Sequence, residues 1–247
     1  MEYVPITINP IYLHTRNERN TQSALDGAKR QRPALIEISY SAGAGKTRMI
    51  QVLAANAGDI YLRCETIFGK SGLDLLQALY RETGMLSPPG RKSPCYYAIV
   101  DKLRGTDTVV FLDEAQRLSR DLLNVVIDLS DATGCVFVLV GEPELRGLMQ
   151  ADKRCWSRCY QSIQFEPLSM PDVVFYLRES TGINISAEIA AILHKNSNGD
   201  FRILRRAVYA LVQFANSKRT REIDTELVQT ALNLGLSGPA RNNRART

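Results

Sequence analysis

The sequence lacks any apolar run that approaches the roughly 18 residues required by a membrane-spanning helix. Apolar residues nevertheless make up 45% of its 247 residues, which is enough for a real core. The first sixteen residues contain Glu2, Pro5 and Pro10 and have no apolar stretch typical of a secretory signal. We therefore expect a cytoplasmic protein without a membrane partner, with one α/β domain and a small helical one.

Cysteine pairs with metal-binding or redox spacing are also absent. The five cysteines are scattered without a C-x-x-C pair, and the chain has only two histidines. An odd number of cysteines without a secretory signal argues against a disulfide framework. No credible set of zinc ligands remains, so we expect ordinary reduced thiols.

The net charge of +5 is concentrated at the two ends of the chain. Residues 235–247 contribute +3 and residues 1–32 contribute +2, which accounts for the whole excess. Basic ends suit a nucleic-acid partner, but they are equally common as solubilising tails. The charge therefore leaves nucleic-acid binding open.

Apolar strand patterns alternate with helical patterns over most of the chain. Strands are predicted at 35–39, 59–62, 109–112, 135–140 and 163–165, and helices at 46–55, 73–81, 96–103 and 122–129. Strands that are apolar throughout are typical of a parallel sheet with helices on both faces, so we predict a three-layer αβα domain. After Pro171 only helical patterns follow, at about 171–179, 186–196, 201–216 and 224–233.

These patterns predict four parts along the chain. An N-terminal extension covers 1–32, with a helix at 21–30, and the α/β domain covers 33–169. A small all-helical domain covers 170–235, and a basic, disordered tail covers 236–247.

A glycine-rich segment follows the first predicted strand and opens a helix. It runs Tyr40-Ser41-Ala42-Gly43-Ala44-Gly45-Lys46-Thr47. In that setting the segment matches the P-loop pattern G-x-x-x-x-G-K-[ST], except that Tyr40 replaces the first glycine. Backbone N–H groups and the helix N-terminus would bind phosphates, Lys46 would reach the β- and γ-phosphates, and Thr47 would ligate Mg²⁺.

Two acids end the apolar strand at 109–112, as in a Walker B motif. Asp113 would hold Mg²⁺, directly or through water, and Glu114 would orient the attacking water. Because the carboxyl ends of parallel strands share one edge of a sheet, these acids are expected to meet Lys46 there. The second acid favours hydrolysis of ATP over binding alone.

The segment from Lys46 to Arg202 resembles the AAA+ ATPases. In that family a polar sensor residue ends the strand at 135–140, where Glu142 stands although Asn, Thr or Ser is more usual. Arg202 in the run Gly199-Asp200-Phe201-Arg202 resembles the sensor-2 arginine of the helical lid. Arg154 and Arg158 are the candidates for a finger that reaches a neighbouring subunit's nucleotide, and either could instead be a surface arginine.

Three further segments resemble the transposition regulators of the Mu B, TnsC, TniB and IstB group. They are Asp113–Leu118 (DEAQRL), Val140–Leu145 (VGEPEL) and the stretch from Arg158 to Leu168. The N-terminal region is shorter than the separate DNA-binding domain of Mu-type B proteins. The resemblance implies ATP-dependent polymerisation on double-stranded DNA as a ring or helical filament, delivery of target DNA to a transposase, and slow, partner-stimulated hydrolysis.

Sequence-independent binding to a duplex requires basic groups that track the phosphates. The candidates are Lys70, Arg91, Lys92, Lys102, Arg104, Arg117 and Arg120. Two other functions stay open, namely a helicase loader or replication initiator, and a secretion or signalling AAA+ protein without DNA affinity. A fourth alternative is a nucleotide-locked scaffold, which Tyr40 favours and Glu114 opposes.

Overall fold

The computed structural model describes residues 3–68 and 72–236, with the side chains described up to residue 233. The chain forms two compact units, one over residues 16–166 and one that joins the N-terminal residues up to 15 with the residues from 167 onward. Lys70 and the tail predicted beyond Leu236 lie outside the described residues. No described helix is long and apolar enough to cross a membrane.

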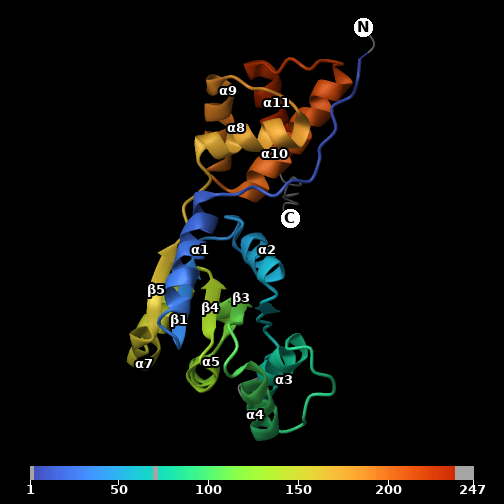
Figure 1. Cartoon of the computed structure of the whole chain (residues 1–247). Coiled ribbons are helices and arrows are strands. Elements are labelled where there is room, and N and C mark those ends of the chain that lie inside the picture. The colour runs from blue at the N-terminus through green and yellow to red at the C-terminus, as the bar shows by residue number, and fades with distance from the viewer. Residues whose placement is uncertain (1–2, 69–71, 237–247) are drawn as a thin grey trace, which may run out of the picture. The chain divides into compact units, whose positions relative to one another are not determined.

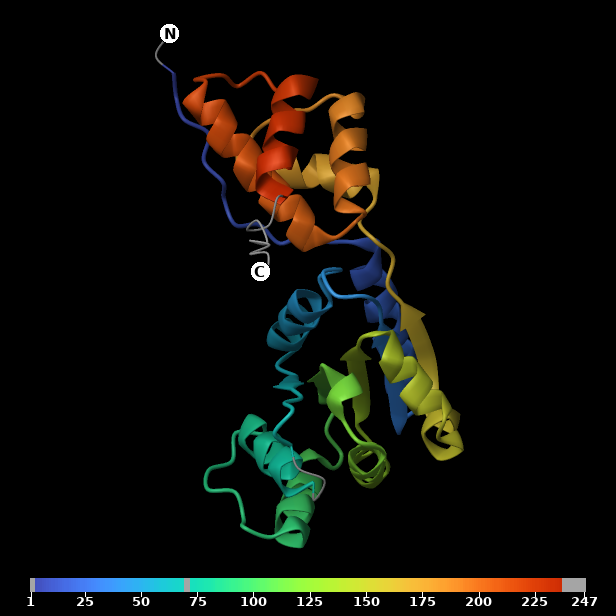
Figure 2. The same ribbon diagram turned by 180° about the vertical axis from the view of Figure 1, so that it is seen from behind.

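The unit over residues 16–166 contains a parallel five-stranded sheet, which confirms the predicted α/β class (Figures 1 and 2). Its strands are β1 (Ala34–Ser39), β2 (Ile60–Arg63), β3 (Val109–Asp113), β4 (Val136–Gly141) and β5 (Cys159–Gln164), in the order β2-β3-β4-β1-β5. Strands β1, β3 and β4 are buried at every position. Their continuous apolar sequences therefore reflect a sheet that is covered on both sides.

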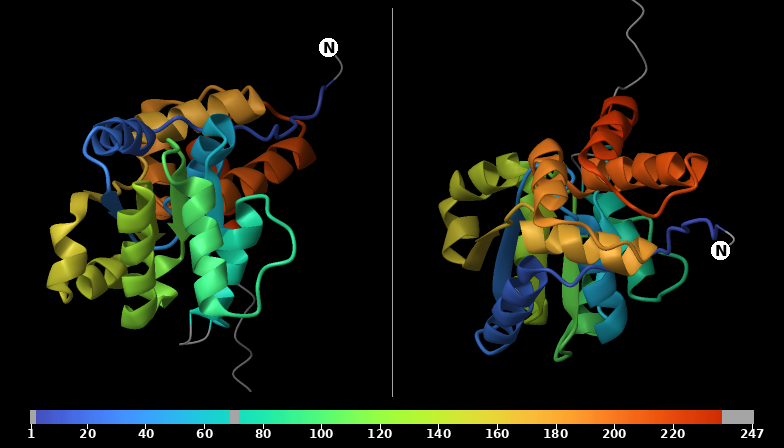
Figure 3. Two further views of the ribbon diagram at one scale, coloured as in Figure 1. Left: turned by 60° about the horizontal axis from the view of Figure 1, so that its bottom comes forward. Right: turned by 90° about the horizontal axis from the view of Figure 1, so that it is seen from above.

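Helices cover the two faces of the sheet in two layers. On one face, α1 (Arg16–Lys29) and α2 (Lys46–Ala57) pack against Ile36, Phe111 and Val138. The opposite face packs against α3 (Leu73–Glu82), α4 (Lys92–Leu103), α5 (Arg120–Thr133), α6 (Pro143–Gln150) and α7 (Lys153–Ser157). Figure 3 shows α1 in blue and the green α4 and α5 on opposite sides of the strands.

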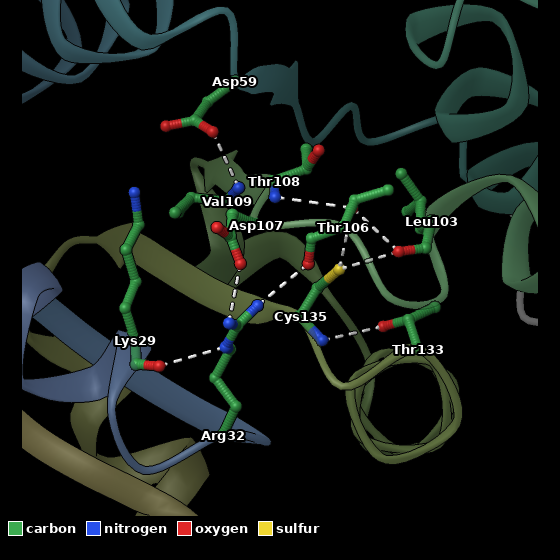
Figure 4. Close-up of polar contacts among 10 residues, drawn as sticks. All are labelled: Lys29, Arg32, Asp59, Leu103, Thr106, Asp107, Thr108, Val109, Thr133 and Cys135. Atoms are coloured by element: carbon green, nitrogen blue, oxygen red, sulfur yellow. Dashed lines mark hydrogen bonds and ion pairs between the residues drawn. The ribbon is translucent and has the colours of Figure 1, made fainter.

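Polar contacts hold together the edge of the sheet where the strands begin. The Arg32 guanidinium donates to the Thr106 carbonyl at 2.9 Å and to the Asp107 carboxylate at 2.7 Å (Figure 4). The N–H of Val109 donates to Asp59 at 2.8 Å. Burial raises the pKa of Asp59, and this hydrogen bond partly offsets that effect. These contacts join Arg32, just before β1, and Asp59, just before β2, to the segment that leads into β3.

The helical unit consists of α8 (Met170–Thr181), α9 (Ala187–Ser197), α10 (Phe201–Ser217) and α11 (Thr225–Leu236). The N-terminal segment is part of this unit, because Ile6 is buried and its backbone N–H and carbonyl both bond the Asn216 side chain. The N–H of Asn9 donates to the Ser180 carbonyl at 2.7 Å. Residues 3–15 therefore belong with the helices.

The observed division corrects the predicted boundaries in two places. The predicted extension at 1–32 is split, since residues 16–32 belong to the α/β unit and the residues before them to the helical unit. The second boundary lies before Pro167 instead of after residue 169, and α11 extends to Leu236. Gly199 explains the shift, because an added Cβ there would strike Pro167, and its carbonyl accepts from the Leu168 N–H at 3.0 Å.

Candidate functional site

The strand register brings the ends of four strands to one edge of the sheet. Arg63 at the end of β2 lies opposite Asp113 at the end of β3, and Ser39 at the end of β1 lies opposite Gly141 at the end of β4. The predicted P-loop leaves β1 at this edge, so the glycine-rich segment and both acids meet there. This juxtaposition follows from the parallel topology.

The P-loop backbone turns at two glycines. Gly43 and Gly45 have φ angles of 92° and 86°, in a region that glycine enters without steric cost. Gly45 caps the twelve-residue helix α2, and no described side chain caps it. The first N–H groups of α2 therefore have the geometry that binds anions at a helix N-terminus.

Lys46 is the first residue of α2 and is largely buried, with 8% of its surface exposed. Its Nζ donates to the carbonyl oxygens of Tyr40 at 2.6 Å and Ser41 at 3.0 Å. The ammonium group is thus held across the mouth of the loop. The replacement of the first glycine by Tyr40 leaves this arrangement intact, because only the Tyr40 backbone contributes to it.

The Asp113 carboxylate accepts three hydrogen bonds. Its Oδ2 accepts from the hydroxyls of Thr47 at 2.8 Å and Tyr61 at 3.0 Å, and its Oδ1 accepts from the Glu114 N–H at 3.0 Å. A hydroxyl and a carboxylate are hard oxygen ligands of the kind that Mg²⁺ prefers. Thr47 and Asp113 therefore fit a magnesium ion beside the phosphate loop.

Two neighbours of Asp113 have raised pKa values. Burial, followed by the charge of Asp113, raises the pKa of Tyr61 to about 12, so the phenol stays protonated as a donor. Burial and the same carboxylate raise the pKa of the Cys64 thiol to about 12. Cys64 is accordingly an unreactive buried thiol, because the thiolate is the reactive form.

Glu114 lies just beyond β3 in a left-handed conformation with a φ of 57°. Its carboxylate lies 3.5 Å from the Arg63 guanidinium and 3.4 Å from that of Arg117, and it accepts from Gln116 Nε2 at 2.8 Å. A non-glycine residue seldom adopts this backbone conformation, which is often found where function fixes a side chain. The contacts direct the carboxylate to the same edge of the sheet as Lys46 and Asp113.

Three residues of this site were not identified from the sequence. Tyr61 lies within β2, Arg63 ends that strand, and Gln116 lies in the 3₁₀ turn η1 (Ala115–Arg117). The sequence predicted a strand at 59–62, which corresponds to β2. The register between β2 and β3 is needed to show that the end of β2 adjoins Asp113. Arg117, one of the residues predicted to contact DNA, pairs with Glu114 and donates to the Cys64 carbonyl at 3.3 Å.

The other predicted site residues lie in several places. Glu142, predicted at the sensor position, precedes α6 (Pro143–Gln150) as its N-cap residue without a capping hydrogen bond from its side chain. Arg154 in α7 pairs with Asp128 on α5, and Arg158 pairs with Asp131 on α5 at 2.9 Å. Arg202 is exposed near the start of α10, in the helical unit, where Asp200 caps the helix.

The residues predicted to contact DNA differ in their partners. Arg120 pairs with Asp152 at 3.1 Å, and Arg104 donates to the Ala132 carbonyl at 3.4 Å. Arg91, Lys92 and Lys102 are exposed at the two ends of α4. These residues lie at the two ends of α4 and at the start of α5.

Comparison with known proteins identifies the α/β unit. Residues 31–149 match the family described as AAA domain. The chain is 24% identical over 224 residues to the Mu-like prophage FluMu DNA transposition protein B of Haemophilus influenzae, covering 87% of this chain and 76% of that protein. It is 30% identical over 112 residues to the ATP-dependent target DNA activator B of Escherichia phage Mu, covering 45% of this chain and 36% of that protein.

Solved structures support the same fold. The Cdc6p protein of Pyrobaculum aerophilum superposes with a TM-score of 0.69 at 16% identity, over 96% of this chain and 73% of that chain. A RuvB protein of Thermogota maritima superposes with a TM-score of 0.61 at 19% identity, over 90% and 70%. At such identities the likeness concerns the fold. The sequence matches assign residues 31–149 to an AAA domain and show that the chain is similar to DNA transposition proteins of the Mu B type.

Proposed function

We propose that the protein is an oligomerising, DNA-binding ATPase that selects or delivers target DNA to a transposase. The ATPase proposal rests on one observation. Four residues lie together at one edge of the sheet, namely Lys46, Thr47, Asp113 and Glu114. Lys46 and the α2 N-terminus would bind the phosphates, and Thr47 and Asp113 would hold the Mg²⁺ that neutralises them. Glu114 would orient and polarise the attacking water.

The DNA part of the proposal is supported by the two named relatives, one a DNA transposition protein and the other a target DNA activator. The chain spans about a third of the length of the phage Mu protein that it matches. Oligomer form, transposase partner and stimulation of a slow hydrolysis by DNA or that partner are therefore parts of the proposal.

The first test is fluorescence anisotropy of a labelled random duplex with ATP, with ADP and without nucleotide, at two salt concentrations. We expect tight binding with ATP that weakens steeply with salt and does not depend on sequence, since contacts to phosphates dominate such binding. Absence of duplex binding under every condition, with ATP hydrolysis intact, would contradict the DNA part and favour a signalling or secretion role. A preference for single strands would instead favour a helicase loader.

The exposed face of α10 is a further candidate surface for the duplex. Arg202, Arg205, Arg206, Tyr209 and Gln213 line a hollow on this helix, which carries no acidic residue. The Arg205 guanidinium lies 5.6 Å from the Tyr209 ring centroid, and Tyr209 is 43% exposed. Arginine, tyrosine and glutamine side chains all donate hydrogen bonds to a phosphate backbone.

Arg205→Glu and Arg206→Glu are each expected to weaken duplex binding for all sequences alike. Each should lower the slope of log affinity against log salt by about 1, because one phosphate contact is lost. Lys195→Glu, an equal charge reversal on α9, is the matched control, and Lys102→Glu tests α4 in the same assay. Duplex binding by the α10 variants that equals that of Lys195→Glu would exclude this face.

Arg154 and Arg158 remain the candidates for the arginine that acts on a neighbour's nucleotide. Replacement of the true finger by alanine should spare ATP binding and lower kcat by about 10²-fold, as loss of one transition-state donor does. The structure supplies the control, since Asp128→Asn and Asp131→Asn break the same ion pairs and leave both arginines. If the aspartate variants lose as much hydrolysis as the arginine variants, the arginines act by supporting α7 and neither is the finger.

A further inference from the structure

The Gln116 side chain joins two points of the candidate site that come from different strands. Its Nε2 donates to Glu114 Oε2 at 2.8 Å, just beyond β3. Its Oε1 accepts from the backbone N–H of Glu142 at 3.2 Å, where β4 passes into α6. The amide thus links the predicted water-positioning acid to the end of the neighbouring strand.

Gly141 provides the space for this contact. An added Cβ at Gly141 would strike Gln116 Oε1, and it would lie 3.3 Å from the Gln116 backbone nitrogen. A side chain at position 141 would therefore push the amide out of its place. Gln116 Oε1 makes the shortest of these contacts, and Leu145 Cδ2, at 3.2 Å from an added Cβ, also limits the space at Gly141.

Further hydrogen bonds link Gly141 to the P-loop. The Gly141 carbonyl accepts from the Tyr40 N–H at 3.3 Å, and the Tyr40 carbonyl accepts from Lys46 Nζ at 2.6 Å. Hydrogen bonds therefore run from Lys46 to Tyr40, from Tyr40 to the Gly141–Glu142 peptide group, and from that peptide through the Gln116 amide to Glu114. A change in the loop at Tyr40 has a direct physical route to the Glu114 carboxylate.

Only an amide of this length satisfies both neighbours of residue 116. The ionised Glu114 carboxylate can only accept a hydrogen bond, and the Glu142 N–H can only donate one. A glutamine offers one donor and one acceptor group, whereas a glutamate lacks the donor and a leucine lacks both. The residue type is thus matched to a connecting role.

We propose that Gln116 is a positioning residue for ATP hydrolysis, which fixes the Glu114 carboxylate relative to the end of β4 and thereby to the P-loop. This inference rests on the proposed ATPase function. Gln116 itself need not touch the nucleotide. Its loss should disturb the placement of the attacking water while the phosphates and Mg²⁺ stay bound.

The test compares Gln116→Ala, Gly141→Ala and the double variant in the full chain, with ATP affinity and kcat measured separately. Each single change should lower kcat by about 10- to 100-fold, the cost of a small misplacement of a catalytic group. ATP affinity should change by less than about threefold, because no phosphate contact is removed. The double variant should be no worse than the worse single variant, since Gly141→Ala acts by displacing the amide that Gln116→Ala has already removed.

Gln116→Glu adds a signature that a purely structural role would not produce. At neutral pH it places a second carboxylate beside Glu114 without a donor between them, so hydrolysis should be lost. Gly147→Ala on α6 is the matched glycine control, because an added Cβ there meets no atom within 4 Å.

The outcomes separate this inference from the proposed function. Wild-type kcat in Gln116→Ala and Gly141→Ala, with Glu114→Gln inactive, would overturn the role of Gln116 and leave the ATPase function standing. An equal loss of ATP affinity, kcat and thermal stability in both variants would show that Gln116 only supports the fold. If Glu114→Gln hydrolyses ATP normally, the proposed site itself is wrong.

Discussion

Lys46→Ala is expected to abolish ATP binding at micromolar nucleotide concentrations. The ammonium group is held over the P-loop by the Tyr40 and Ser41 carbonyls, where it can meet the β- and γ-phosphates. Loss of charge-assisted hydrogen bonds of this kind costs about 1.5–3 kcal/mol each, so affinity should fall by about 100-fold or more. Isothermal titration with ATP and Mg²⁺ measures the loss directly.

Arg48→Ala is the matched control, because it removes the same charge from an exposed position two residues further along α2. Thermal unfolding separates binding from folding. ATP should raise the melting temperature of wild type and of Arg48→Ala but not of Lys46→Ala, since a ligand stabilises only a fold that binds it. Unchanged ATP affinity in a folded Lys46→Ala protein would refute the assignment of the phosphate site.

The sequence predicted the parallel sheet because its strands are apolar throughout and alternate with helical patterns. No helix was predicted from the sequence at α6 or α7, although Pro143 is the first residue of α6. Proline is well suited to that position, because the first helical N–H has no partner within the helix. The N-terminal segment was misplaced for another reason, as its attachment to Asn216 joins residues far apart in the chain.

The predicted P-loop and Walker B residues meet at one edge because adjacent parallel strands end there. The residues that surround Glu114 could not be found in this way. Arg63 is placed near Glu114 by the register between β2 and β3, and Gln116 by a 3₁₀ turn. Neither feature produces a periodic pattern in the sequence. The ion pairs of Arg154 and Arg158 with α5 likewise depend on packing, which spacing along the chain does not reveal.

Glu114→Gln is expected to bind ATP but to hydrolyse it about 10²- to 10⁴-fold more slowly, the usual contribution of a general base. The change keeps the size of the side chain and leaves Lys46, Thr47 and Asp113 untouched. ATP affinity and kcat should therefore separate completely in equilibrium and single-turnover measurements. If the protein assembles with ATP and disassembles after hydrolysis, the variant should also form longer-lived oligomers, which light scattering can follow.

Glu144→Gln makes the same acid-to-amide change at an exposed position on α6 and should retain wild-type turnover. Glu114 also has a second role, because it forms ion pairs with two arginines. It neutralises Arg63 and Arg117, and the amide leaves both guanidinium groups without that counter-charge. If loss of those ion pairs were the cause, an Arg63→Gln, Arg117→Gln double variant would stall as Glu114→Gln does. If it turns over ATP while Glu114→Gln does not, the Glu114 carboxylate itself positions the water.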